Sequence, residues 1–279
     1  MTTGTTVPVH LAVARWLPGR RARGWDRPVW VGAATVLILL SVWEVAAQVS
    51  SEATARIPAP SSIGAALGTL IGDGTLWAAT AQTLISTGLG LAIATIAAVL
   101  AGIVCGTFVF VQRSTNILIE LMRPIPPVAL LPVGLLIFGT SLEMKLALVI
   151  YTAFWPVFIQ TAYGMRDIDA TLLDMARIHR VRRWRRLTGI VLPSIGGYVA
   201  IGLRLSVIGA LVASIITELI GGAAGLGYIL GIAQSTGQDA RMYAIVFVIG
   251  FFGLAVNGVF GIFERRVLKW SHSNREGAQ

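Results

Sequence analysis

The feature that most constrains this chain is a run of 39 residues without a charged side chain, from Gly74 to Gln112. As one continuous helix the run would be about 58 Å long, nearly twice the ~30 Å hydrocarbon core of a membrane. Of the 279 residues, 55% are hydrophobic and only 13% are charged, against about 25% charged in soluble domains. We therefore predict an all-helical integral membrane protein, in which this helix is tilted or partly outside the membrane and spans at about 86–110.

Five further stretches are apolar enough to span, which predicts six spans. They are residues 29–49, 128–142, 146–165, 195–217 and 242–263. A seventh span at 219–238 is disfavoured by its glycines, and because it would place the basic C-terminal segment outside. With six spans the inner segments hold 18 Lys and Arg residues and the outer segments hold three. Basic residues collect on the cytoplasmic side, so both termini are predicted to be cytoplasmic.

The segments outside the spans follow from this topology. Residues 1–28 should be a mobile basic tail in the cytoplasm, 50–76 an external loop with a surface helix, and 264–279 a cytoplasmic tail. The core should extend over 77–263. A cleaved signal peptide is the alternative for 29–49, but the apolar run is long for one and contains Glu44.

The longest polar interruption, residues 166–193, carries seven Arg and three Asp. It cannot lie in hydrocarbon and is predicted to be a cytoplasmic loop. Asp169 is placed to cap a short helix with Asp174 and Arg177 on its flank. Apolar residues at helical spacing give this helix one hydrophobic side: Ile168, Leu172, Met175, Ala176 and His179.

This loop resembles the docking loop of ABC importer permeases, whose pattern is Glu-Ala-Ala, three residues, Gly, nine residues, Ile, one residue, Leu-Pro. Four residues match in register: Ala176, Ile190, Leu192 and Pro193. Three differ, with Asp174 in place of the Glu, Met175 in place of the first Ala and Arg180 in place of the Gly. The resemblance implies a loop that inserts into a groove on a cytoplasmic ATPase. The residues it assigns to docking are Asp174, Met175, Ala176, Arg177 and Arg180. A basic loop that only sets topology is the alternative.

A second specific match begins at Arg123, which is followed by four prolines in nine residues. These are Pro124, Pro126, Pro127 and Pro132. The missing amide donors exclude a regular helix start, so this backbone should be kinked and shielded by protein or water. The run is similar to the Arg-Pro-Ile-Pro-Pro stretch of the nitrate, sulfonate and taurine branch of these permeases. The similarity continues in order through FGTSLEMK (138–145), YTAFWPVFIQTAYGMRDID (151–169), GLRLS (202–206), TELIGGAAGLGYIL (217–230) and ERRVLKW (264–270).

The resemblance implies the six-helix core of the type I class and a set of partners. These are a second permease copy or paralogue, two ATPases that hold ATP and Mg, an external solute-binding protein and membrane lipid. The expected solute is small and anionic or polar, such as a sulfonate, taurine or nitrate, with a vitamin precursor of pyrimidine type as the alternative. Candidates for the pathway or gate are Arg204, Pro124, Pro126, Pro127 and Glu218.

Arg204 has two interpretations. If its helix begins near Pro193, it lies about 16 Å along the axis and close to mid-membrane, where a charge needs a partner or water. It either faces the pathway and offers its guanidinium to an anion, or caps carbonyls of the kinked 124–132 segment or pairs with a carboxylate of another helix.

Several chemistries have no pattern in this sequence. There is no phosphate-binding G-x-x-x-x-G-K-[S/T] motif, so ATP binding by this chain is not expected. Three scattered histidines and the single Cys105 indicate no metal site, catalytic triad or disulfide. The glycine-rich segment GGAAGLG (221–227) is interpreted as a flexible turn or a re-entrant segment. Gly102 and Gly106 are interpreted as a site of close helix packing.

The net charge of +9 does not predict nucleic-acid binding, since the basic residues flank the spans. Neither an enzyme nor a cofactor of its own is expected. An ion-driven secondary transporter is the main rival, and it should show internal repeats and ion ligands at mid-depth. A membrane scaffold without transport is disfavoured by the proline-broken backbone.

Overall fold

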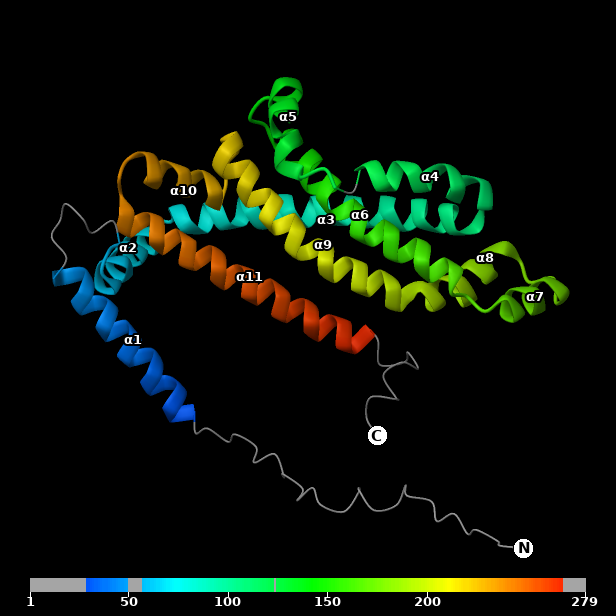
Figure 1. Cartoon of the computed structure of the whole chain (residues 1–279), viewed down its shortest axis with the longest axis horizontal. Helices are drawn as coiled ribbons and strands as arrows, with labels where there is room; N and C mark the ends of the chain where they lie inside the picture. The colour runs from blue at the N-terminus through cyan, green and yellow to red at the C-terminus, as the bar shows by residue number, and fades with distance from the viewer. Residues whose placement is uncertain (1–28, 50–56, 123, 268–279) are drawn as a thin grey trace, which may run out of the picture.

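The structure is a computed structural model that describes residues 29–49, 57–122 and 124–267, and the regular secondary structure in these ranges is helical. The tails 1–28 and 268–279 lie outside the described residues. In chain order the elements are α1 (Val29–Val49), α2 (Pro60–Gly72), α3 (Thr75–Thr107), α4 (Val109–Met122), a 3-10 turn (Pro127–Leu130), α5 (Leu131–Phe138), α6 (Leu142–Arg166), α7 (Ala170–Ile178), α8 (Arg183–Arg186), a π-helical turn (Leu187–Val191), α9 (Leu192–Gly221), α10 (Leu226–Ser235) and α11 (Asp239–Val267) (Figure 1).

The core consists of α3, α6 and α9, which pack along one another (Figure 1). As predicted, α3 is longer than a membrane is thick, with 33 residues. Its buried side is a stripe of small residues that lets α6 approach closely. A Cβ on Gly102 would lie 2.6 Å from the Cβ of Thr161, and one on Gly106 would collide with Met165. The predicted packing role of these two glycines is confirmed.

The span predicted at 128–142 is not a separate helix long enough to cross a membrane. The helical part is the 3-10 turn and α5, Pro127 to Phe138, which is too short to cross a membrane alone. Together with the helix at residues 110–122 it forms a bent pair, in which the axes of the two helical parts differ by 86°. The predicted break at the prolines is thus confirmed. At the break the carbonyl of Met122 accepts from the hydroxyl of Tyr151 at 2.8 Å and from the N–H of Ile125 at 3.3 Å. Within the described residues five helices are long enough to span, or six if the bent pair is one span.

α9 begins at Leu192, beside Pro193 as expected, but Pro193 does not mark the start of the helical stretch. α8, the π-helical turn and α9 form one helical stretch from Arg183 to Gly221, 39 residues long. In the turn the N–H of Leu192 reaches back five residues to the carbonyl of Leu187. Pro193 has no amide hydrogen and cannot donate the ordinary helical hydrogen bond to the residue four positions earlier. The wider turn lets the helix continue past it.

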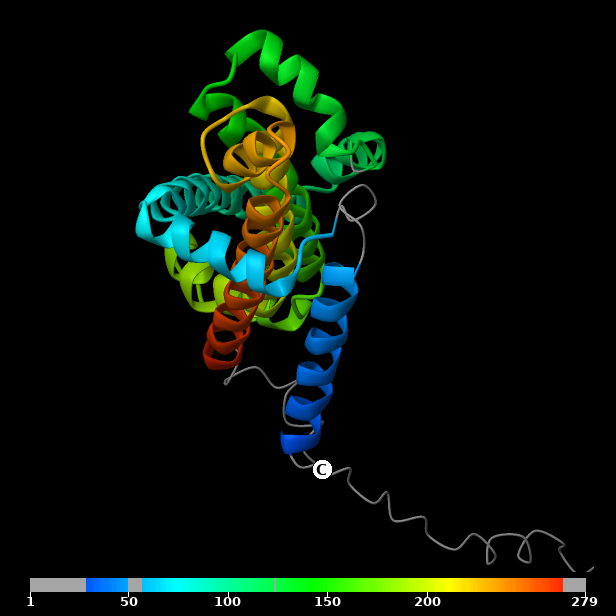
Figure 2. The ribbon, with the colours of Figure 1, turned by 90° about the vertical axis from the view of Figure 1, so that its left-hand side faces the viewer.

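α2, α10 and α11 pack against one another beside this core, and α1 stands apart from it next to α2 (Figure 2). α1 has the predicted bounds. The carboxylate of Glu44 on α1 accepts hydrogen bonds from the N–H of Ser61, at 3.0 Å, and from its hydroxyl, at 2.7 Å, so it caps the start of α2. At ten residues α10 is too short to span, which agrees with the rejection of a seventh span.

A buried ion pair joins α6 to α9 at the end of the core opposite α7 and α8. Lys145 is 2% exposed and Glu218 is 0% exposed, and the two side chains form a salt bridge. The ammonium of Lys145 also donates to the carbonyls of Ala224, at 3.2 Å, and of Gln82, at 3.5 Å. Lys145 is one of the three basic residues predicted to lie in the outer segments, together with Arg56 and Arg241, but it lies within α6 and is buried.

The carboxylate of Glu218 collects donors from three segments. It accepts from the hydroxyl of Thr83 on α3 (2.8 Å), the hydroxyl of Ser214 (3.2 Å) and the N–H of Gly227 (2.8 Å). The Thr83 hydroxyl in turn accepts from the N–H of Leu226 at 2.9 Å. α3, α6, α9 and the first turn of α10 therefore converge on one carboxylate.

The glycine-rich segment 221–227 is held in place by this cluster. Gly222 has φ +73° and ends α9, and Gly225 has φ +154°. A Cβ on Gly225 would overlap the carboxylate of Glu218. The interpretation of this segment as a flexible turn is therefore wrong, because its glycines permit close approach to a buried charge.

We predict that Glu218→Leu lowers the free energy of unfolding by about 3–5 kcal/mol, because it leaves the Lys145 ammonium buried without a counter-charge. The double variant Lys145→Met with Glu218→Leu removes both charges, and we expect it to recover more than half of the loss. Thermal unfolding of wild type, Glu218→Leu, Lys145→Met and the double variant in the same detergent measures both effects. A double variant as unstable as the sum of its two single variants would show that the charges do not interact.

Candidate functional site

The helix α7 lies at one end of the core, beside α8 (Figure 1). Its start is as predicted, since the carboxylate of Asp169 accepts from the N–H of Thr171 at 2.8 Å. Hydrogen bonds from Thr171, chiefly from this backbone N–H, hold the pKa of Asp169 below its ordinary value. The cap therefore persists wherever this carboxylate is ionised.

The apolar residues of this segment face two ways. Ile168 and Ala176 are buried, and Ile168 packs with Val191 and Ile195 at the start of α9. Met175, which was expected on the same side, is exposed, as are Leu172 and His179. The predicted hydrophobic side is wrong for Ile168, which precedes the helix, where helical spacing does not apply.

The exposed apolar side chains of α7 form a ridge that has no cover within the described residues. We call this set the α7 ridge: Leu172 (48% exposed), Met175 (55%) and Ile178 (77%). Beside it Asp174 and Arg177 form an ion pair at 3.0 Å, with both side chains more than 60% exposed. The predicted position of this pair on the flank of the helix is confirmed.

Arg180 occupies the position where the family pattern has glycine, and the backbone shows why glycine suits it. Its φ is +51°, the only positive φ among the described residues other than glycine. The N–H of Val181 donates to the carbonyl of Ala176 at 2.9 Å, and that of Arg180 donates to the carbonyl of Arg177 at 3.0 Å. This is a Schellman ending, in which the left-handed position favours glycine.

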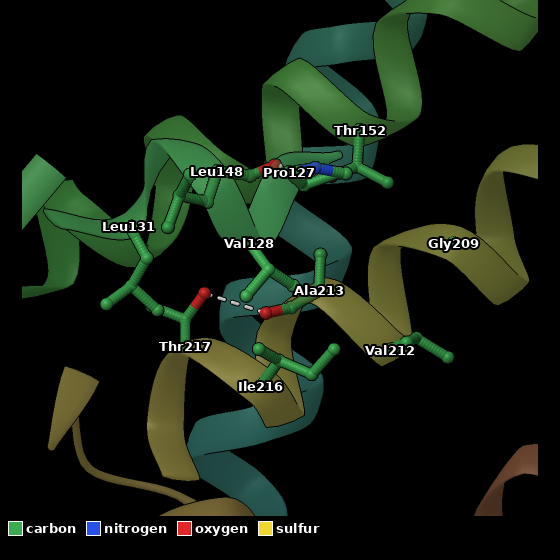
Figure 3. Close-up of a pocket in the computed structure, with 10 residues that line it drawn as sticks. All are labelled: Pro127, Val128, Leu131, Leu148, Thr152, Gly209, Val212, Ala213, Ile216 and Thr217. Carbon is green, nitrogen blue, oxygen red and sulfur yellow. Dashed lines mark hydrogen bonds between the residues drawn. The ribbon is translucent and has the colours of Figure 1, made fainter. Parts of the chain in front are cut away.

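A cavity of about 310 Å³ lies at the proline break. It is lined by Ile125, Pro127, Tyr151, Thr152, Trp155, Pro156, Ile159, Gln160 and Leu205. A second cavity of about 200 Å³ shares Pro127 and Thr152 with it and extends between the broken span and α9; Figure 3 shows its lining residues. None of the lining residues of the two cavities carries a charge.

The structure separates the pathway candidates. Pro127 lines both cavities, and Pro126 precedes the 3-10 turn in an extended conformation. Pro124 is exposed in the same break. Glu218 lies elsewhere, in the buried cluster.

Arg204 is exposed on α9 and takes part in an interaction. The next residue, Leu205, lines the larger cavity. Since successive helical residues point about 100° apart, Arg204 is directed away from Leu205.

Sequence reasoning missed Tyr151 and Gln160 as lining residues and the pairing of Lys145 with Glu218. Gln160 had a recognisable signal, because polar side chains within an apolar span are costly and are usually functional. The pairing of Lys145 with Glu218 had no recognisable sequence signal, since the two residues are far apart in the sequence.

Comparison with known proteins agrees with this architecture. Residues 98–269 match the family model described as "Binding-protein-dependent transport system inner membrane component". The chain is 27% identical to a putative aliphatic sulfonates transport permease protein, SsuC, of Bacillus subtilis, over 97% of this chain and 96% of that protein. It is 27% identical to the nitrate import permease protein NrtB of Leptolyngbya laminosa, over 64% of each. It is also 27% identical to the riboflavin transport system permease protein RibX of Chloroflexus aurantiacus, over 94% and 98%.

The fold resembles a solved structure of the MetNI methionine ABC transporter in an inward-facing conformation. The TM-score is 0.56 at 18% identity, over 71% of this chain and 96% of that chain. The long apolar helices and the family match identify a multi-pass protein of the inner membrane. It is a transport subunit rather than an enzyme, and ATP hydrolysis takes place in a separate subunit. The chain belongs to the family of inner-membrane components of binding-protein-dependent transport systems, the permeases of ABC importers.

Proposed function

We propose that this permease docks on a cytoplasmic ATPase through α7. The α7 ridge carries the proposal, because apolar side chains up to 77% exposed on the polar end of a membrane protein need a partner to cover them. Asp174, Arg177 and Arg180 would lie at the margin of this contact, with Ala176 fixing the helix to the core. The arginine-rich end then lies in the cytoplasm together with both termini.

The working importer proposed here contains two permease chains, identical or paralogous, two ATPases and one external binding protein. This chain binds no cofactor of its own, and ATP with Mg belongs to the ATPases. α7 is attached to the start of α9 through Ile168, Val191 and Ile195. Movement of a docked ATPase would therefore reach α9 as a rigid-body displacement, because packed helices shift as units.

The proposed solute is small and anionic or polar. Two of the similar permeases are named for anions, aliphatic sulfonates and nitrate, and the third is named for riboflavin, a vitamin. The cavity at the proline break offers Tyr151, Thr152 and Gln160 as polar groups and has no carboxylate in its lining to repel an anion. Arg204 is proposed as a solute ligand, with capping of carbonyls in the 124–132 segment or pairing with a carboxylate of another helix as the structural alternative.

An ion-driven transporter is less well supported. Such a protein needs charged or polar ion ligands near the middle of the membrane. The buried charged side chains among the described residues are Lys145 and Glu218, which neutralise each other at one end of the core.

Replacing Asp174 by Lys should weaken docking without unfolding the chain, because the carboxylate is 62% exposed. We expect recovery of the co-purified ATPase to fall about tenfold or more, the effect of about 1.4 kcal/mol at an interface, and solute uptake to fall with it. Asp73→Lys is the matched control, since Asp73 is also an exposed carboxylate paired with an arginine, Arg241, at 3.8 Å. It lies at the other end of the core and should leave ATPase recovery intact. Equal recovery from both variants would remove Asp174 from the docking site.

Replacing Arg180 by Gly should stabilise the chain by about 1 kcal/mol, because glycine adopts a positive φ without strain. Arg180→Ala removes the same charge but keeps the strain, so it should not stabilise. Thermal unfolding compares the two variants, and ATPase co-purification shows whether the lost charge matters for docking. If glycine and alanine give the same stability, backbone strain at this position is not the cause.

A further inference from the structure

A second exposed surface adjoins the α7 ridge. We call it the α8 cluster, and it consists of Arg182, Arg183, Trp184 and Arg185. All four side chains are exposed, and Trp184 is 72% exposed. Three cations and a large aromatic ring thus surround a single turn of helix, with the half-buried Arg186 next to them.

The charge of this cluster is not balanced within the described part of the chain. No carboxylate there pairs with any of its arginines. The three aspartates of the same loop are engaged elsewhere. Asp174 pairs with Arg177, Asp169 caps α7, and Asp167 accepts from the hydroxyl of Tyr198 at 2.7 Å. The cluster is therefore a compact positive surface that fits an anionic partner.

The position of the cluster identifies that partner. α8 is the first turn of the 39-residue helix that continues as α9. Such a helix is about 58 Å long, whereas a bilayer with its headgroups is 40–45 Å thick. A helix of this length cannot lie wholly in the hydrocarbon, and its arginine-rich first turn is the end that must leave it. At the interface that it crosses, tryptophan is enriched and clustered arginines bind anionic lipid.

We propose that the α8 cluster binds the phosphate headgroups of anionic phospholipids in the leaflet next to α7. Trp184 rests at the boundary of the headgroups and the acyl chains, and the arginines contact the phosphates. This contact fixes the height and tilt at which the α7 ridge projects from the membrane. The ridge is apolar and the cluster is cationic, so the two surfaces fit different partners.

The test uses the full-length chain in detergent, titrated with phosphatidylglycerol or with phosphatidylcholine. Native mass spectrometry counts the bound lipids. The wild-type chain should retain more phosphatidylglycerol than phosphatidylcholine, and this preference should weaken as the salt concentration rises. Each arginine near an anionic surface strengthens binding about fivefold, so Arg183→Gln with Arg185→Gln should weaken phosphatidylglycerol binding about 25-fold. The matched control is Arg177→Gln with Arg180→Gln, which removes two charges from the same loop and should keep the preference.

Two results would overturn the proposal. In one, the Arg183 and Arg185 variant keeps its phosphatidylglycerol preference. In the other, the same variant no longer co-purifies with the ATPase while its lipid binding is unchanged. That result would assign the cluster to a contact with another protein. Should this double variant fail to fold, Trp184→Leu in the intact arginine cluster is the second test, and it should also reduce retention of phosphatidylglycerol.

Discussion

The arrangement of the core depends on one buried ion pair, Lys145 with Glu218. Two charges at 2% and 0% exposure are tolerable only where each is compensated. The compensation comes from α3, α6, α9 and the loop before α10, so none of these can shift alone without leaving a buried polar group unsatisfied. The positive φ of Gly222 and the close approach of Gly225 follow from the same constraint.

The two ends of the core have opposite character. At the ion-pair end Lys145, Glu218 and Thr83 are buried and find their partners within the chain, so this end holds itself together. At the α7 end the apolar ridge and the α8 cluster are exposed, as suits surfaces completed by partners. α6 and α9 connect the ends, with Gly202 of α9 so close to α6 that a Cβ would lie 2.9 Å from the carbonyl of Pro156. This packing favours transmission of movement by rigid bodies.

Features set by local sequence were predictable. The bounds of α1, the cap at Asp169, the break at the prolines and the packing of Gly102 follow from hydropathy or from spacing over a few residues. Features set by distant contacts were not. Lys145 was misplaced because a lysine near the end of an apolar run resembles a loop charge, and only the fold brings Glu218 to it. The π-helical turn before Pro193 was missed because a proline normally marks a helix start.

The central claim is that the α7 ridge is covered by an ATPase, and cysteine labelling tests it most directly. The single native Cys105 is 1% exposed, so an Ile178→Cys variant presents one reactive thiol to a membrane-impermeant maleimide. Labelling should be fast in the chain alone and at least about tenfold slower in the assembled complex, since burial at an interface excludes the reagent. Equal labelling rates in the two samples would contradict docking through α7.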